Sequence, residues 1–180
     1  MGKAHLDTQW VQLAQEAKGA YKIKMRFDAD GEAQKLALYH KDPAHQPDWI
    51  AAEVEARHPG AQILYWEKEW YEGDGDVVEV EFKTAEGVEC ELSFLADKTL
   101  KYTECPMALD ALPEAARAAL EAKVPGAEID EVESKKGPKM DILSVKLKKE
   151  GRTHYLTMSP DGKILSHHLR LPASVDIPMP

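Results

Sequence analysis

The sequence has no long apolar run and only two cysteines among its 180 residues. A membrane-spanning helix needs about 18 or more consecutive apolar residues, and no such segment occurs. We therefore expect no membrane span. Residues 1–5 lack the apolar core of a secretory signal peptide. Either the protein is cytoplasmic, or a leader has been removed from it.

The marks of a nucleic-acid-binding protein and of an enzyme are also missing. The formal charge is −9 and no basic stripe is present, so nothing in the sequence is suited to displacing counterions from phosphates. The motifs Gly-x-Ser-x-Gly, Gly-Lys-Ser/Thr and His-Glu-x-x-His do not occur. We expect no catalytic residues and no cofactor. A hydrolase that uses unmarked carboxylates stays open, because 32 Asp and Glu residues are available.

An internal repeat is the strongest feature that the sequence does contain. The stretch 47–67 recurs 66 residues later with nine identities. The identical pairs are Pro47/Pro113, Ala52/Ala118, Glu55/Glu121, Ala56/Ala122, Pro59/Pro125, Gly60/Gly126, Ala61/Ala127, Ile63/Ile129 and Glu67/Glu133. The alignment continues at an offset of 65 around residues 78–82 and of 64 at residues 87 and 97. We interpret the chain as a duplicated unit.

Each copy has the pattern of one helix followed by four strands. A helix begins near Pro47 and ends at Pro59-Gly60, and its counterpart runs from Pro113 to about Val124. Alternating runs follow at 61–72, 76–83, 87–95 and 99–105, and again at 127–135, 140–149, 152–158 and 163–170. Such alternation indicates an antiparallel sheet with one buried and one wet face, the helix covering the buried face.

A shorter segment precedes the copies. Residues 5–18 have the spacing of an amphipathic helix, and a β-hairpin is predicted around Asp30-Gly31. A two-residue turn there would pair Phe27 with Gln34, Met25 with Leu36 and Ile23 with Leu38. The predicted fold is α+β, a tandem repeat of one helix packed on a four-stranded antiparallel sheet, preceded by a helix plus β-hairpin. The predicted domains are 1–45, which is open to interpretation as a partial third copy, 46–106, 107–172 and a Pro-rich tail at 173–180.

The order of these signals resembles the PepSY-like family, whose architecture is similar to that of the beta-lactamase inhibitor protein (BLIP). The residues that carry the resemblance are Leu-Pro-Glu-Ala at 112–115, Val-Pro-Gly-Ala-Glu-Ile at 124–129 and Ser-Pro-Asp-Gly-Lys-Ile at 159–164. The first copy matches through Pro-Gly-Ala-Gln-Ile at 59–63 and through Ala-Asp-Lys at 96–98, where the Gly after Asp97 is missing. The resemblance covers roughly residues 46–171.

The resemblance implies an exported, bacterial, non-catalytic protein, periplasmic or secreted. Its expected function is binding in the cell envelope, where it engages a protein or peptide partner through open sheet faces, as an inhibitor or a sensor. The alternative is a carrier that holds a small ligand or a metal between the repeats. The family supplies no catalytic residues.

The candidate partner-binding surface is the aromatic stretch Tyr65, Trp66, Trp70 and Tyr71. In an extended strand the two tryptophans share one face and the two tyrosines the other. Aromatic residues beside charges are typical of interface hot spots. The second copy has no aromatic residue at these positions, so the fold does not require them. The alternative is that one tryptophan packs against the helix or the other copy.

The two cysteines lie on neighbouring predicted strands. If Asp97 and Lys98 form a two-residue turn, Cys90 and Cys105 lie directly opposite each other, close enough for a disulfide. A three-residue loop would instead pair Leu100 with Phe94 and move Cys105 out of line. A disulfide fits the oxidising periplasm that the resemblance implies. Two reduced, half-buried thiols are the alternative.

The seven histidines do not form a recognised metal-binding pattern. His154 and His167 are expected to be diagonal neighbours on one sheet face, and His40 and His45 are close in sequence. Neither pair has the spacing of a known ligand set, so we expect no metal. Residues 28–32 begin like a calcium loop but lack its twelve-residue frame, and they are predicted to form a turn.

Overall fold

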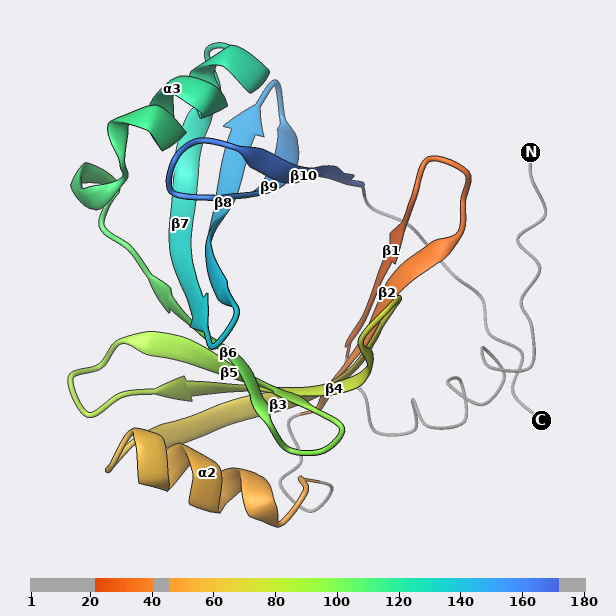
Figure 1. Cartoon of the computed structure of the whole chain (residues 1–180), viewed down its shortest axis with the longest axis vertical. Coiled ribbons are helices and arrows are strands. Elements are labelled where there is room, and N and C mark those ends of the chain that lie inside the picture. Colours follow the sequence, from red (N-terminus) through yellow and green to blue (C-terminus); the bar gives the residue numbers. More distant parts are fainter. Residues whose placement is uncertain (1–21, 41–45, 172–180) are drawn as a thin grey trace. The chain divides into compact units, whose positions relative to one another are not determined.

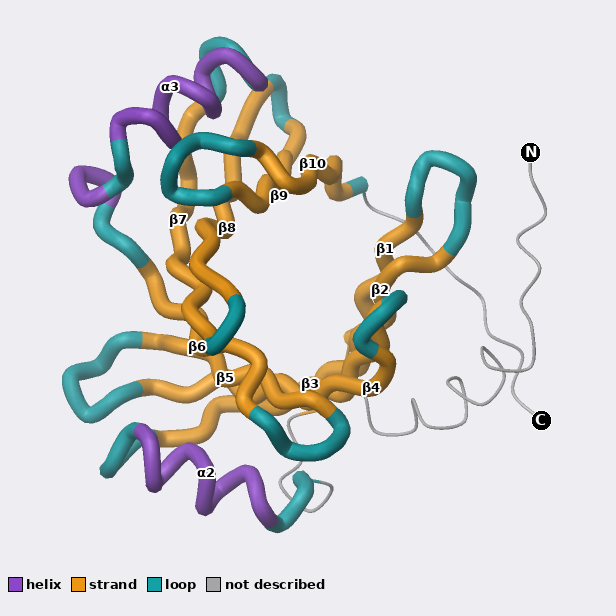
Figure 2. The backbone as a smooth tube through the Cα atoms, in the orientation of Figure 1, coloured by secondary structure: helices purple, strands orange, loops and turns teal. Residues whose placement is uncertain are grey.

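The computed structural model describes residues 22–40 and 46–171. The helix predicted over 5–18, His45 and the predicted Pro-rich tail at 173–180 lie outside the described residues. The chain divides into two compact units between Leu100 and Lys101, and each is described by itself (Figures 1 and 2).

Unit 1 is a five-stranded antiparallel meander with one α-helix. Its elements are β1 (Lys22–Phe27), β2 (Ala33–His40), α2 (Trp49–Arg57), β3 (Gln62–Tyr71), β4 (Gly75–Lys83) and β5 (Glu89–Leu95). Strands that follow one another in the chain are also neighbours in the sheet. The apolar residues of β3–β5 that face α2 form the core, where Trp49 packs edge-on against Phe94 with ring centroids 5.1 Å apart.

Unit 2 also combines five antiparallel strands with one α-helix, but its α-helix follows the first strand and not the second. Its elements are β6 (Leu100–Pro106), the 3₁₀ helix η2 (Leu109–Ala111), α3 (Glu114–Lys123), β7 (Glu128–Gly137), β8 (Met140–Lys149), β9 (Arg152–Met158) and β10 (Ile164–Arg170). The strands again pair in chain order. The core joins Ala116 and Leu120 of α3 to apolar residues of β7, β8 and β9. No helix in the described ranges is both long and apolar enough to cross a bilayer.

The predicted fold class is wrong, because the chain is not a tandem repeat of a helix on a four-stranded sheet. Strands make up 56% of the described residues and helices 15%. The β1–β2 hairpin does not stand apart, since β2 pairs with β3 from Lys35↔Tyr71 to His40↔Trp66. The strand predicted to end the first copy, β6, pairs with β7. A two-stranded hairpin is marginal alone, so it is stabilised by adding to an open sheet edge.

Local features do recur at the 66-residue spacing. The Glu55 carboxylate accepts a hydrogen bond from Gly60 N–H at 3.1 Å, and Glu121 does the same for Gly126 N–H at 3.0 Å. Both glycines have a positive φ, a conformation that is sterically unfavourable for residues with a Cβ. The C-terminal ends of α2 and α3 are therefore formed by the same residue types.

The turn of the β1–β2 hairpin differs from the predicted one. Two of the three predicted pairs are confirmed, but Phe27 lies opposite Ala33 instead of Gln34. The Asp28 carboxylate accepts the backbone N–H groups two and four residues later, each at 2.9 Å. These two hydrogen bonds stabilise a loop that is longer than the predicted two-residue turn.

The hairpin loop that contains Lys98 has no glycine, yet it has the same form as the loop that contains Gly162. Leu95 N–H donates to Thr99 O at 3.0 Å, and Ser159 N–H makes the same bond four residues on, also at 3.0 Å. Lys98 has φ 69° where Gly162 has φ 93°. A lysine there is strained relative to glycine, but the backbone geometry is retained. The loop between Leu95 and Thr99 is thus the three-residue alternative, yet neither cysteine is a free thiol, so the loop length alone does not decide whether Cys90 and Cys105 pair.

Candidate functional site

The sheet face of unit 1 that points away from α2 is rich in charged residues. We call it the polar face of unit 1. The alternating pattern predicts a wet face, yet five of its polar residues are buried. Their exposed fractions are Lys35 6%, Glu67 3%, Glu69 1%, Glu79 3% and Ser93 0%. Buried charges are costly unless they are paired, so the contacts of these groups matter.

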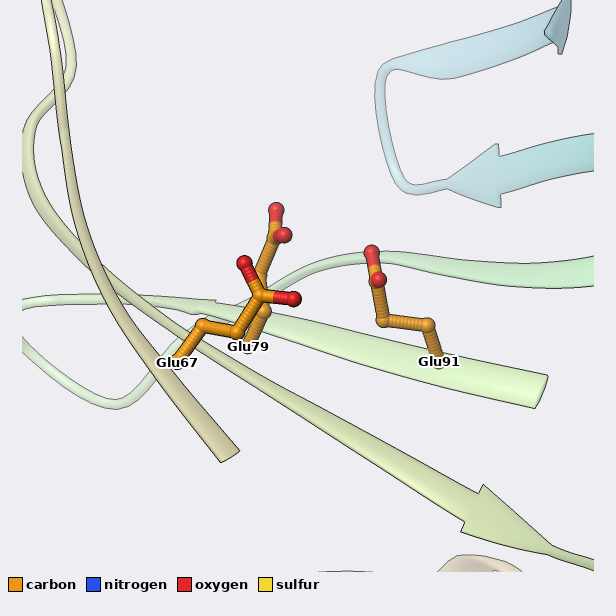
Figure 3. A group of neighbouring side chains, drawn as sticks. All are labelled: Glu67, Glu79 and Glu91. Carbon is orange, nitrogen blue, oxygen red and sulfur yellow. The ribbon is translucent and has the colours of Figure 1, made fainter. Parts of the chain in front are cut away.

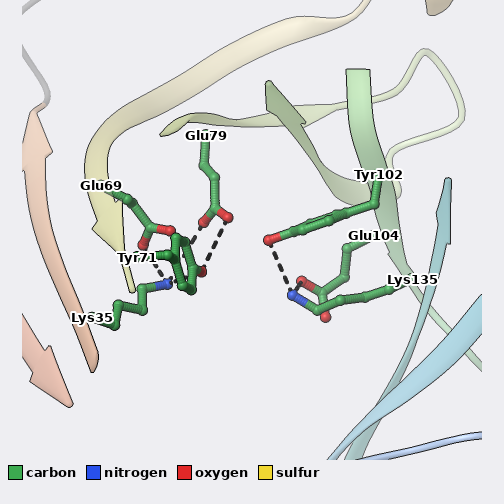
Figure 4. Close-up of polar contacts among 7 residues, drawn as sticks. All are labelled: Lys35, Glu69, Tyr71, Glu79, Tyr102, Glu104 and Lys135. Atoms are coloured by element: carbon green, nitrogen blue, oxygen red, sulfur yellow. Dashed lines mark hydrogen bonds and ion pairs between the residues drawn. The ribbon is translucent and has the colours of Figure 1, made fainter. Parts of the chain in front are cut away.

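Lys35 is the centre of the first group of contacts (Figure 4). Its ammonium forms an ion pair with Glu69, lies 3.9 Å from Glu79 Oε2, and donates a 2.6 Å hydrogen bond to Tyr71 Oη. It also lies 4.6 Å from the centroid of the Tyr71 ring. Burial alone lowers the pKa of Lys35, but the carboxylates of Glu79 and Glu69 outweigh burial and raise it. The lysine therefore stays charged.

Three carboxylates from adjacent strands form the second group (Figure 3). Glu67 of β3 lies opposite Glu79 of β4, and Glu91 of β5 is the third member. One carboxylate oxygen from each lies within 4.8 Å of the others. Burial, then the charges of Glu69 and Glu79, raise the pKa of Glu67 to about 9. In residues 22–40 and 46–171, these three side chains could hold a metal ion.

Unit 2 has a related group on the face that points away from α3. Lys135 Nζ forms a 2.6 Å ion pair with Glu104 Oε2 and donates to Tyr102 Oη at 3.2 Å (Figure 4). Lys135 stands 66 residues after Glu69, so the charges on the two strands are exchanged between the units. Burial, followed by the charge of Glu104, raises the pKa of the neighbouring Glu133 to about 8.

The rest of this face in unit 2 is partly accessible. We call it the β8–β10 face and define it by Ser144, Tyr155, Thr157, Ser166 and Arg170. Register places Ser144 opposite Thr157 and Thr157 opposite Ser166. The Thr157 and Ser166 hydroxyls are 2.6 Å apart. Arg170 is exposed, and its guanidinium lies 3.9 Å from the centroid of the half-buried Tyr155 ring.

The predicted aromatic surface is divided between the two faces of β3. Trp66 is buried, 7% exposed, and stacks on His40 with centroids 4.5 Å apart. Tyr71 lies in the Lys35 group on the polar face. Trp70 and Tyr65 are half-buried. The structure brings none of the four to a fully exposed position, and whether any of them contacts a partner stays a prediction.

Lys35, Glu79 and Glu91 are not among the residues predicted from the sequence. The available signal was the set of glutamates that recur at every second position of β4 and β5. That pattern was interpreted as a solvated face, because alternation shows which residues share a face but not whether the face is covered.

Neither Cys90 nor Cys105 is a free thiol in the structure, and the bridge between them stays a prediction. We expect titration of the unreduced, denatured protein to detect no thiol, because a disulfide does not react without a reductant. Two titrated thiols would remove the bridge. After reduction the same assay should count two, which controls for access of the reagent.

The predicted proximity of His154 and His167 is confirmed. Nδ1 of His154 and Nε2 of His167 are 2.9 Å apart on β9 and β10. Burial, and then the charges of His154 and Lys123, lower the pKa of His167. In the part of the chain that the structure describes, this pair belongs to no group of three metal-ligating side chains.

Comparison with known proteins gives a fold but no family. No family model matches the chain, and no curated protein matches it. A candidate periplasmic protein from Bacteroides eggerthii has a TM-score of 0.56 at 18% identity, over 69% of this chain and 89% of that one. A DUF2874 family protein from Bacteroides uniformis has a TM-score of 0.55 at 18% identity, with the same coverage of 69% and 89%.

A third solved structure carries a descriptive name. A BLIP-like protein from Bacteroides fragilis has a TM-score of 0.52 at 21% identity, over 77% of this chain and 97% of that one. The architecture is BLIP-like. Identities this low establish the fold alone, so the PepSY-like assignment stays a prediction. The periplasmic description of one neighbour is consistent with the predicted periplasmic or secreted location.

Proposed function

We propose that this protein is a non-catalytic binding protein of the bacterial cell envelope, and that it engages a protein or peptide partner through the β8–β10 face. The observation that carries the proposal is the Tyr155–Arg170 pair, an aromatic ring and a guanidinium 3.9 Å apart on a partly accessible sheet face. Tyr and Arg are enriched among the residues that dominate binding energy at protein interfaces.

The surroundings of this pair suit a docking surface. The hydroxyls of Ser144, Thr157 and Ser166 form a row across three strands, and these short side chains let a partner approach the sheet closely. They also supply hydrogen bonds without the entropy cost of ordering long side chains. The helix α3 packs on the opposite face, and the residues of the β8–β10 face are half-buried or exposed.

The non-catalytic part of the proposal is supported by the sequence, which has none of the searched nucleophile, phosphate-binding or metalloprotease motifs. The envelope location is supported by the description of a structural neighbour as a candidate periplasmic protein. The resemblance to the PepSY-like family and the BLIP-like architecture support a role as inhibitor or sensor.

The test is capture of the partner from the host's envelope fraction by the wild-type chain and by Tyr155→Ala/Arg170→Ala. We expect the double variant to lose about tenfold or more of the captured partner, because truncating two hot-spot residues each costs about 1–2 kcal/mol or more. Quantitative mass spectrometry of cross-linked material measures the loss.

The matched control is Glu53→Ala/Arg57→Ala, which removes an exposed ion pair of 3.1 Å on α2. It should leave both folding and capture unchanged, since exposed pairs contribute about 0–1 kcal/mol. Equal capture by all three proteins, with equal melting temperatures, would contradict the proposed face.

A further inference from the structure

The side chains of Glu67, Glu79 and Glu91 extend from three adjacent strands on the polar face of unit 1 (Figure 3). One oxygen from each lies within 4.8 Å of the others. Calcium binds oxygen at about 2.3–2.6 Å, so two of its ligands can be at most about 5 Å apart. The three carboxylates therefore already lie within the span of a single coordination sphere.

Two carboxylates of this cluster are buried, since Glu67 and Glu79 are both only 3% exposed. The ammonium of Lys35 forms an ion pair with Glu69 and lies 3.9 Å from Glu79 Oε2. Burial, and then the charges of Glu69 and Glu79, raise the pKa of Glu67, and the charge of Lys24 lowers it. Carboxylates that approach one another in a buried position repel, and a cation that binds between them would relieve this repulsion.

A separate observation points to a ligand at the same place. Ser93 is fully buried, with 0% exposure, and its hydroxyl has no hydrogen-bond partner. It lies directly opposite Glu79 in the sheet and two residues after Glu91 on the same strand, so it shares their face. Oε2 of Glu67 is likewise buried without a partner. A buried polar atom left unpaired costs about 1–3 kcal/mol.

We propose that Glu67, Glu79, Glu91 and the Ser93 hydroxyl form a binding site for a calcium ion on the polar face of unit 1. This site goes beyond the proposed partner binding, which uses unit 2. A bound ion would coordinate the Ser93 hydroxyl and the buried Glu67 oxygen, and it would reduce the repulsion among the three carboxylates. Glu91 is the most accessible of the three carboxylates, so the ion would reach the site from its side.

The chemistry of the donors selects the ion. All four side chains offer oxygen and none offers nitrogen or sulfur, which disfavours zinc. Three carboxylates and a hydroxyl can supply up to seven oxygens, in the range that calcium takes. Magnesium demands a near-ideal octahedron with shorter bonds and keeps several of its waters, which a cluster of buried carboxylates does not favour.

Isothermal titration calorimetry of the full, chelator-treated chain with calcium chloride tests the site, with magnesium chloride and zinc chloride as comparisons. We expect one calcium per chain and a rise in melting temperature with calcium, because a ligand that binds only the folded state stabilises it. Calorimetry that detects no calcium binding, or a stoichiometry of several weak ions, would overturn the proposal.

Single substitutions test whether the ion binds at these residues. Glu91→Gln removes a half-buried carboxylate and should weaken calcium binding about tenfold or more, whereas Glu86→Gln, the same charge change in an exposed turn, should leave it unchanged. Ser93→Ala keeps the charge and should also weaken binding without lowering the melting temperature of the calcium-free protein. If Glu91→Gln and Glu86→Gln behave alike, the binding is a general charge effect and the site is wrong.

Discussion

Replacing Lys35 with methionine should destabilise unit 1 by about 3–5 kcal/mol, the cost of removing one partner from a buried ion pair. Lys35 is 6% exposed and Glu69 is 1% exposed, so the carboxylate cannot turn to water when its ammonium is lost. Tyr71 would lose its 2.6 Å hydrogen bond as well. Urea unfolding in the presence of a chelator measures the change as a lower midpoint at constant slope.

Two further variants separate the buried pair from a general effect of removing a lysine. Lys83→Met breaks a 2.8 Å pair with Glu89 in which both side chains are exposed, and it should cost only about 0–1 kcal/mol. Lys35→Met/Glu69→Gln removes both charges and should recover part of the loss. If Lys35→Met costs no more than Lys83→Met, the pair contributes nothing through its burial.

Unit 2 should lose stability as the pH rises from about 4.5 to about 8, through the titration of Glu133. Burial and the nearby Glu104 raise the pKa of Glu133 from 4.5 to about 8 in the folded protein. The folded state therefore holds a proton that the unfolded state releases. Stability from this group is complete below pH about 4.5 and is lost as the pH passes the folded pKa. The pKa shift sets an upper limit of about 5 kcal/mol on the loss of unfolding free energy. We expect a loss of about 2–3 kcal/mol, because Glu133 keeps some contact with solvent.

The measurement is the free energy of unfolding at pH 5 and pH 8 for the wild type and for Glu133→Gln. Other raised carboxylates, Glu67 among them, give a slope of the same sign, so the difference between the two proteins isolates Glu133. The variant should be less sensitive to pH and more stable than the wild type at pH 8. Glu128→Gln, on the exposed start of β7, should keep the wild-type slope. Equal slopes in all three proteins would contradict the assignment.

Much of the secondary structure could be predicted from the sequence, because local signals determine it. The bounds of β8 and β9 are those expected from alternation, Met140–Lys149 and Arg152–Met158. The helices lie between their proline and Pro-Gly boundaries, as predicted. The grouping of strands into sheets could not be predicted in the same way. Which open edge a hairpin joins depends on pairs far apart in sequence, such as Lys35 and Tyr71.

The candidate sites were harder to predict for the same reason. Glu79 and Glu91 alternate with apolar residues, and alternation alone indicates a solvated face. Their burial and their approach to Glu67 depend on the register of three strands. Trp66 illustrates the opposite case, since its aromatic character suggested a surface and its contact with His40 of β2 places it inside. Composition identified the unusual residues but not their neighbours.

The exchanged charges of the two units have a consequence for folding. Strands β3 and β7 align at the 66-residue spacing, so either could pair with the other's neighbouring strand while the chain collapses. In that arrangement Lys35 of β2 would meet Lys135, and Glu104 of β6 would meet Glu69. Like charges in a poorly solvated position repel each other. This repulsion destabilises the misassembled forms and not the native one. We therefore expect the opposite polarity of the two ion pairs to disfavour arrangements in which β2 pairs with β7 or β6 pairs with β3.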